Sequence, residues 1–456
     1  MSQDYPARAS RVIIPPLPFF REYQLQSAPW YYNLVSVAGL LLICALAWLT
    51  GRNRRRVYWP GFFWGLGIML AMGALVFTLP MGRTVLLWLN RAVVALLDHA
   101  QAGIKFVFGP LALGPGQEGS LGFILGVQAL PTVIFFMALS AVLYQAGIMQ
   151  WVVRLFARLF VRTLGASGAE SLGVASNIFV GVESAGMVRP FLPQLTRSEF
   201  FCLLTSCMAT VASTTLGVYV STLREVFPNI AGHLVSASII SAPAAILVAK
   251  LMEPETGEPV TAGRTVDPEV GRYGGYMEAI TQGSMDGVKL LVGIVALLIS
   301  FLSLVSLANG LLGWAGEGLG FPGLSLEGLL SRLAWPLAVA MGVPPADAGQ
   351  VAGLLGERIL VTEIPAYVHL SEILNQGGLQ YSRSALVASY ALCGFTHVGS
   401  VAIFVGGYGA LAPTRLGELS RLGLKALWAA TLATLVTGCV AGIFASGGNM
   451  LLGFSS

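Results

Sequence analysis

The apolar stretch at residues 167–219 is repeatedly interrupted by Glu, Asn, Ser, Thr and Gly. Carboxylates and amides are costly at the depth of a lipid bilayer, and small residues beside them interrupt helices. The two kinds of residue persist together mainly where backbone and side chains line a cavity or an ion path. A second stretch of this kind covers residues 357–410. Two such segments, one in each half of a chain, are typical of secondary transporters.

The composition is that of a polytopic membrane protein. Of the 456 residues, 55% are apolar and only 11% are charged, which lies outside the range of soluble domains. The net charge is +4, and the basic residues cluster at the ends of apolar runs, without interleaved aromatic residues. A nucleic-acid-binding surface is therefore not indicated, and lipid is the expected surrounding.

The cysteines and the amino-terminal residues point to no further function. The five cysteines lie in apolar segments without a CxxC spacing, which favours small buried residues over a metal or redox site. Residues 1–30 lack the basic start, apolar core and cleavage site of a removable signal peptide. Membrane insertion is therefore expected to depend on the first membrane-spanning segment.

Eight segments are long and apolar enough to cross a bilayer as helices. They cover residues 32–50, 60–79, 123–147, 199–222, 234–251, 288–307, 386–405 and 424–444. Segments 83–108 and 151–164 alternate charged and apolar faces, which predicts helices that lie along the membrane surface. The predicted fold is an all-α membrane protein with about eight transmembrane helices, interfacial helices and two re-entrant hairpins.

Basic residues near the ends of the spans predict the orientation. The run at 51–56, the arginines of 151–164, the loop after residue 252 and the basic residues of 415–425 are all cytoplasmic if the amino terminus is outside. Both termini are then outside. The predicted organisation is an amino-terminal segment (1–119), a first transport half (120–252), a cytoplasmic linker (253–285) and a second transport half (286–456).

The two halves share a weak internal repeat. An offset of 186 residues superposes Cys207 on Cys393 and Thr210 on Thr396. Each of these segments follows a polar stretch too broken to span, and the predicted orientation makes the two segments cross in opposite directions. This pattern predicts an inverted repeat of a re-entrant hairpin followed by an interrupted helix.

Asn177 and Thr210 are candidate ligands of a cation. Asn177 lies at the expected tip of the first hairpin, and Thr210 lies at the expected break of the next helix, with free carbonyls near Val180 and Val211. Oxygen ligands and the carboxyl ends of half-helices suit a hard cation such as sodium. The alternatives are that Asn177 caps a helix ending at Gly181 and that Thr210 bonds its own preceding turn.

Glu183 and Glu363 are candidate contacts of a transported solute, because an acidic residue deep in a membrane segment is functional by default. The alternative is a structural ion pair, for which Arg189 and Arg358 are close enough in sequence.

His397 lies between two glycines in the sequence GFTHVGS. A lone histidine in an apolar run is usually a satisfied core residue, but the glycines and the nearby Ser400 make contact with a ligand an equal alternative. Phe395 could stack on a planar ring, or else face lipid or the core.

Several segments resemble the concentrative nucleoside transporters in order and spacing. They are VQALPTVIFFMALSAVLYQAGIMQ (127–150), SGAESL (167–172), SNIFVG (176–181), VRPFLPQLTRSE (188–199), MEAITQGSMDGVKL (277–290), ASYALCGF (388–395) and GGYGALAP (406–413). The resemblance implies a homotrimer whose protomers each have eight spans and two re-entrant hairpins. It also implies an elevator-type carrier that uses a sodium or proton gradient to accumulate nucleosides.

The resemblance also assigns the site residue by residue. It places the sodium site on Asn177 and Thr210, with backbone at Val180 and Val211, and the ribose-binding carboxylate on Glu363. The predicted contacts of the solute are Val182, Glu183, Ser184, Thr215, Thr362, Glu363, Phe395, His397 and Ser400.

The site also departs from the family. GVESAG (181–186) stands where GQTEAP is common, Thr362 and His397 each replace an asparagine, and Pro365 follows the second-hairpin glutamate. Amides offer paired donors and acceptors, whereas Val offers none and His offers one of each. The preferred solute is therefore left open.

The predicted function is cation-coupled import of nucleosides, or of a related polar heterocyclic solute, across the bacterial cytoplasmic membrane. Sodium is the expected coupling ion, and a proton carried by Glu183, Glu363 or His397 is the alternative. A sensor that keeps the transporter scaffold is a rival class. An intramembrane enzyme is disfavoured, because no HExxH or nucleophile-elbow motif is present.

Overall fold

The computed structural model describes residues 25–114, 117, 119–181, 184–267, 273–318, 320, 324–445 and 453. Two predicted site residues, Val182 and Glu183, lie outside the described residues. Within the described ranges the regular elements are helices, and the β-type pairing is a single bridge between Gln26 and Tyr381.

The first half of the chain runs from α1 to α11. Its elements are α1 (Tyr31–Thr50), η1 (Arg54–Arg56), α2 (Trp59–Phe77), α3 (Pro80–Phe108), η2 (Gly109–Ala112), α4 (Leu125–Gln128), α5 (Thr132–Gln145), α6 (Ile148–Leu164), α7 (Gly168–Asn177), α8 (Ser184–Met187), η3 (Arg189–Gln194), α9 (Arg197–Ala209), α10 (Ser213–Leu223) and α11 (Ile230–Met252). The second half contains α12 (Tyr276–Gly318), α13 (Leu326–Ala340), α14 (Pro345–Leu360), α15 (Glu363–Asn375), α16 (Ser382–Leu392), α17 (Val398–Leu411), η4 (Pro413–Arg415) and α18 (Leu416–Phe444).

Eight helical segments of the described chain are long and apolar enough to cross a membrane, which confirms the predicted fold class. Seven of them coincide with predicted spans. The eighth is Pro80–Ala112, which was expected at the membrane surface. Its few charges are spaced widely enough to leave an apolar window of 18 residues. The predicted span at 386–405 is instead divided between α16 and α17.

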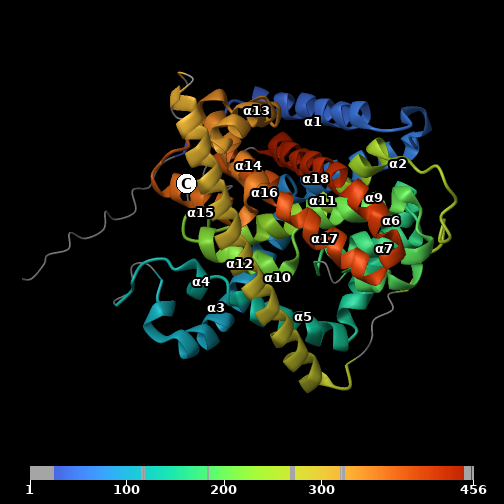
Figure 1. The fold of residues 1–456 in the computed structure, drawn as a ribbon, viewed down its shortest axis with the longest axis horizontal. Coiled ribbons are helices and arrows are strands. Elements are labelled where there is room, and N and C mark those ends of the chain that lie inside the picture. Colours follow the sequence, from blue (N-terminus) through green and yellow to red (C-terminus); the bar gives the residue numbers. More distant parts are fainter. Residues whose placement is uncertain are drawn as a thin grey trace, which may run out of the picture.

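Helix α12 begins earlier than the sequence suggests. It is 43 residues long and starts at Tyr276, inside the segment predicted as a linker. Only 6% of its most apolar 18-residue window is buried, so most of that window lies at the surface of the molecule. Figure 1 shows α12 crossing the molecule diagonally; α5 is its main packing partner. The division into halves stays a prediction.

Both predicted helix breaks are present, and they touch each other. Helix α9 gives way at Thr210, which is extended (φ −111°, ψ 160°), before α10 begins at Ser213. Helices α16 and α17 are separated by residues 393–397. A Cβ atom at Gly394 would lie 2.8 Å from the carbonyl oxygen of Ala209, so only glycine lets the second break approach the first so closely.

Helix pairs precede each broken helix, as the predicted hairpins require. Helix α7 packs against the short α8, and α14 packs against α15. Capping boxes start α7 at Ser167 and α9 at Thr196, because each hydroxyl is followed three residues later by a glutamate that returns a bond to the cap.

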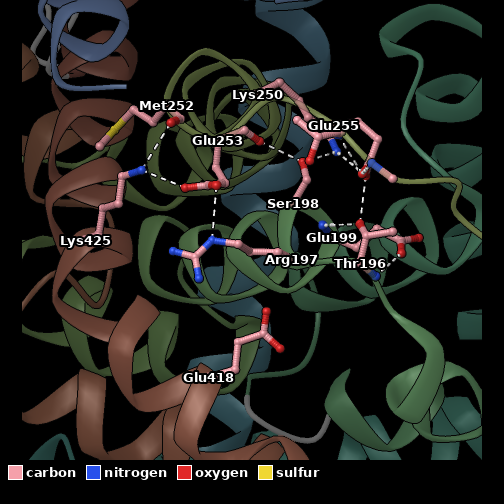
Figure 2. Close-up of polar contacts among 12 residues, drawn as sticks. Thr196, Arg197, Ser198, Glu199, Lys250, Met252, Glu253, Glu255, Glu418 and Lys425 are labelled. Atoms are coloured by element: carbon pink, nitrogen blue, oxygen red, sulfur yellow. Dashed lines mark hydrogen bonds and ion pairs between the residues drawn. The ribbon is translucent and has the colours of Figure 1, made fainter. Parts of the chain in front are cut away.

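A polar network joins the capped ends of these helices. The ammonium group of Lys250, on α11, lies 2.7 Å from the carboxylate of the fully buried Glu170. Glu253 pairs with Arg197 at 3.1 Å and with Lys425, on α18, at 2.7 Å (Figure 2). The network therefore ties α7, α9, α11 and α18 into one body.

Replacing Lys250 with methionine is expected to lower the free energy of unfolding by about 3–5 kcal/mol, because it leaves Glu170 buried without a cation. The double variant Glu170→Gln/Lys250→Met should recover most of this loss. Thermal unfolding of the purified protein in detergent measures both, with the exposed Lys105→Met as control. Equal destabilisation of the single and double variants would contradict the pairing.

Candidate functional site

A cavity of about 260 Å³ lies where the helix breaks face α12. It is lined by six of the predicted solute contacts, which are Thr215, Thr362, Glu363, Phe395, His397 and Ser400. Gly181, the last described residue before Val182 and Glu183, also lines it. The structure thus brings together residues that are far apart in the sequence.

Local helix ends present these side chains to the cavity. Thr362 caps the amino terminus of α15, and its hydroxyl accepts a bond from the backbone amide of Ile364. Glu363 is the first residue of α15, where the positive end of the helix dipole favours a carboxylate. The break between α16 and α17 supplies Phe395 and His397, and α17 supplies Ser400.

The Glu363 carboxylate is buried and has one free oxygen. Its Oε1 accepts a hydrogen bond from the Tyr219 hydroxyl at 2.7 Å. Its Oε2 has no hydrogen-bond partner among the described residues and lies 3.8 Å from Nε2 of His397. A buried acceptor without a donor carries a desolvation cost, which a ligand hydroxyl would relieve.

Arg358 is not the ion-pair partner of Glu363. Its Nη1 donates to the carbonyl oxygen of Ala391 and, at 3.1 Å, to the hydroxyl of Thr434. Within the described chain no carboxylate lies within 4.0 Å of this guanidinium. The structural alternative for Glu363 is therefore wrong in this form.

His397 has a capping role as well as a place in the cavity wall. It is the N-cap of α17, and its Nδ1 accepts a hydrogen bond from the backbone amide of Ser400 at 3.2 Å. In the neutral ring the proton then lies on Nε2, which is the nitrogen directed toward Glu363. A solute hydroxyl placed between them would meet a donor and an acceptor.

Asn177 and Thr210 meet at the carboxyl end of α9. The Asn177 amide nitrogen donates to the Thr210 hydroxyl oxygen and, at 3.1 Å, to the carbonyl of Ser206. Both side chains are buried. Asn177 therefore donates hydrogen bonds to the end of another helix and does not act as a cap of α7. The Thr210 hydroxyl also donates a hydrogen bond to the Ser206 carbonyl in its own preceding turn.

Three other predicted residues have different positions. Ser184 is not among the residues that line the cavity. It begins α8, and its hydroxyl lies 3.5 Å from the side-chain oxygen of Asn177. The Val211 carbonyl accepts a hydrogen bond from the Ser238 hydroxyl at 3.0 Å, so one of its two lone pairs remains for a cation. Val180 is buried just after α7.

Sequence reasoning missed Tyr219 and the wall formed by α12. Tyr219 is four residues after Thr215, so the two share one face of α10, and this spacing was a usable signal. Leu290, Gly293 and Ile294 of α12 line the cavity but carry no chemical signal in the sequence, whereas the charged Lys289 of α12 also lines it.

A polytopic helical protein in which two interrupted helices meet beside a cavity has the architecture of a secondary membrane transporter. Three family models match the chain. "Na+ dependent nucleoside transporter N-terminus" matches residues 38–111, "Nucleoside recognition" matches 126–225, and "Na+ dependent nucleoside transporter C-terminus" matches 233–442. The chain belongs to the concentrative nucleoside transporter family. The intramembrane enzyme is thereby excluded.

Relatives in animals and bacteria are similar over most of the chain. Solute carrier family 28 member 3 of Mus musculus is 37% identical over 90% of this chain, which spans 59% of that protein's length. The uncharacterized transporter YutK of Bacillus subtilis is 36% identical, with 90% of this chain and 99% of the relative covered. A substrate-bound, inward-facing structure of CNTnw superposes with a TM-score of 0.84 at 32% identity, covering 91% of this chain and 98% of CNTnw.

Proposed function

We propose that the protein is a sodium-coupled symporter that carries nucleosides across a membrane. The observation that carries this proposal is the cavity, in which Glu363, Phe395, His397 and Ser400 converge from the second half of the chain next to the first hairpin. The family descriptions, which name sodium dependence and nucleoside recognition, support the assignment.

The cavity offers each part of a nucleoside a contact of the right kind. The unpaired Oε2 of Glu363 accepts a ribose hydroxyl, and Nε2 of His397 donates to the same end of the solute. Phe395 stacks on the planar base. The predicted base contacts Val182 and Glu183 follow Gly181 in the chain and lie outside the described residues.

Sodium binds, in this proposal, between Asn177 and Thr210. A half-turn of the Asn177 amide exchanges its nitrogen for its oxygen, which then faces the ion with the Thr210 hydroxyl and the carbonyls near Val180 and Val211. The negative carboxyl end of α9 adds attraction. The ion would join α7 to α9 and order the first hairpin beside the cavity, which couples its binding to that of the nucleoside.

The arrangement of the cavity wall supports an elevator-type movement. One wall belongs to the hairpins and helix breaks, and the other belongs to α12. The Lys250–Glu170 pair joins α7 to α11, and the contacts of Glu253 in Figure 2 join α9, α11 and α18, so these helices can shift as one body past α5 and α12. Spin labels on α12 and α15 would report a distance change on adding substrate; a fixed distance would contradict the movement.

A homotrimer in the cytoplasmic membrane completes the proposal. The exposed apolar surface of α12 is available to other copies of the chain or to lipid. Native mass spectrometry would give the copy number, and a monomer that transports would contradict trimerisation as a requirement.

Contacts among the basic segments support termini that lie outside. The backbone amide of Arg52 bonds the Met252 carbonyl at 2.8 Å, and Arg154 pairs with Asp267 at 3.1 Å. These segments, with Lys425 beside Glu253, therefore gather at one end, which the charge rule places in the cytoplasm. A cysteine introduced at position 55 should not react with a membrane-impermeant thiol reagent added outside the cell, and reaction from outside would contradict this orientation.

Equilibrium binding of uridine and adenosine in sodium and in choline tests the function itself. Reciprocity requires that sodium raise nucleoside affinity by the same factor by which the nucleoside raises sodium affinity. Calorimetry of the purified protein measures both. Equal nucleoside affinity in the two salts would contradict sodium coupling, and binding without flux in vesicles would favour the sensor.

A further inference from the structure

Arg358 is a fully buried guanidinium whose charge the proposed function does not use. It lies near the end of α14 with 0% of its surface exposed. Its Nη1 bonds the Ala391 carbonyl and the Thr434 hydroxyl, while Nε and Nη2 have no partner among the described residues.

The other large buried arginine is satisfied differently. Arg383 uses Nε, Nη1 and Nη2, and its acceptors include the carbonyls of Gly342 and Tyr32 and the hydroxyl of Ser36. Two of the three nitrogens of Arg358, by contrast, are left without an acceptor, so hydrogen bonding alone does not explain its burial.

The charge of Arg358 is compensated in part by the end of a helix, and the Glu363 carboxylate is the other opposite charge that acts on it. Burying a guanidinium costs several kcal/mol unless an opposite charge lies near. Helix α16 ends at Leu392, and its carboxyl end carries about half a negative charge. Arg358 bonds the Ala391 carbonyl of this last turn, directly before the break that carries Phe395 and His397.

The first half of the chain has a comparable contact without the charge, made from a different position of the repeat, because the 186-residue offset places Asn177 opposite Glu363. There the first helix of the hairpin, α7, sends Asn177 to the Ser206 carbonyl at the carboxyl end of the broken helix α9. The 186-residue offset places Ser206 opposite Leu392, which is next to Ala391. One half therefore presents a neutral amide to the negative helix end, and the other half presents a permanent cation.

We propose that Arg358 is a tethered cation that takes, in the second half, the place that sodium takes in the first. The inference rests on the proposed sodium site. Arg358 is then a positioning residue, which holds the segment 393–397 and so orients Phe395 and His397 without touching the solute. Because the second helix end is already neutralised, one sodium ion moves with each nucleoside.

Arg358→Met and Arg358→Lys separate charge from volume. Methionine fills much of the space without a charge, so uridine affinity at saturating sodium should fall at least about tenfold, while sodium affinity without nucleoside stays within about twofold. Lysine keeps the charge, so its uridine affinity should stay within about threefold of the wild type. Size-exclusion profiles confirm the fold, and Arg224→Met, which removes a half-exposed arginine, is the control.

Two outcomes of this comparison would overturn the inference. One is uridine binding by Arg358→Met that equals the wild type, and the other is an equal loss in Arg358→Lys and Arg358→Met. A general structural defect would lower sodium affinity and uridine affinity together.

A measurement on the unaltered protein decides the same question if a variant does not fold. The membrane potential at which net uridine flux reverses in vesicles gives the number of sodium ions moved per uridine, and the inference requires one. Two ions per uridine would overturn the role of Arg358 and leave sodium-coupled symport intact. No sodium dependence at all would instead refute the proposed function.

Discussion

Replacing Glu363 with glutamine is expected to lower sodium-driven nucleoside uptake by at least about 100-fold, because each hydrogen bond to a charged acceptor contributes about 1.5–3 kcal/mol and ribose offers two hydroxyls. Glutamine has nearly the same shape, but its amide nitrogen cannot accept a hydroxyl proton. In one orientation of the amide this nitrogen faces the Tyr219 hydroxyl, and in the other orientation it faces the solute. The loss should therefore appear in nucleoside binding itself.

Initial rates of tritiated uridine uptake into proteoliposomes, together with the uridine dissociation constant, measure this effect. Glu372→Gln makes the same chemical change at an exposed position of α15 and should leave uptake unchanged. If the Glu363→Gln variant binds and accumulates uridine as well as the wild type does, Glu363 is not part of the nucleoside site.

Replacing Asn177 with alanine is expected to weaken strongly the stimulation of uptake by sodium. The change removes the side-chain oxygen proposed for the ion and the two bonds that hold α7 to the end of α9. The concentration of sodium that gives half-maximal uptake should rise by more than about tenfold, because a lost ligand to a buried cation is not replaced by water at the same geometry.

Sodium titrations of uridine uptake at constant ionic strength, with choline as the replacement, provide the measurement. Asn309→Ala removes an asparagine that bonds Glu327 and the Leu326 amide, away from both sites, and is the matched control. Uptake by Asn177→Ala that keeps the sodium dependence and half-saturation of the wild type would refute the assignment of the ion.

Hydropathy and local polarity were sufficient to predict most of the fold. Seven spans follow from apolar length, and the breaks at Thr210 and near His397 follow from polar and small residues inside apolar runs. The exceptions have local causes. Helix α3 carries so few charges that it is apolar enough to span the membrane. Helix α12 extends into the polar segment that was predicted to be a linker.

The pairings inside the site were less accessible from sequence. Tyr219 and Glu363 are 144 residues apart, and their contact depends on how α10 packs against α15. Arg358 is five residues before Glu363 and was a plausible partner, but the helix turns its side chain toward α16 and α18. Sequence distance predicts which residues are near a segment, and not the direction in which a side chain points.

Accumulation of tritiated uridine in proteoliposomes under an inward sodium gradient is the decisive test of sodium-coupled nucleoside import. We expect uridine to rise inside the vesicles above its external concentration, and not to do so when choline replaces sodium or when the sodium gradient is dissipated. Uridine that only equilibrates, or that accumulates equally well without sodium, would contradict it.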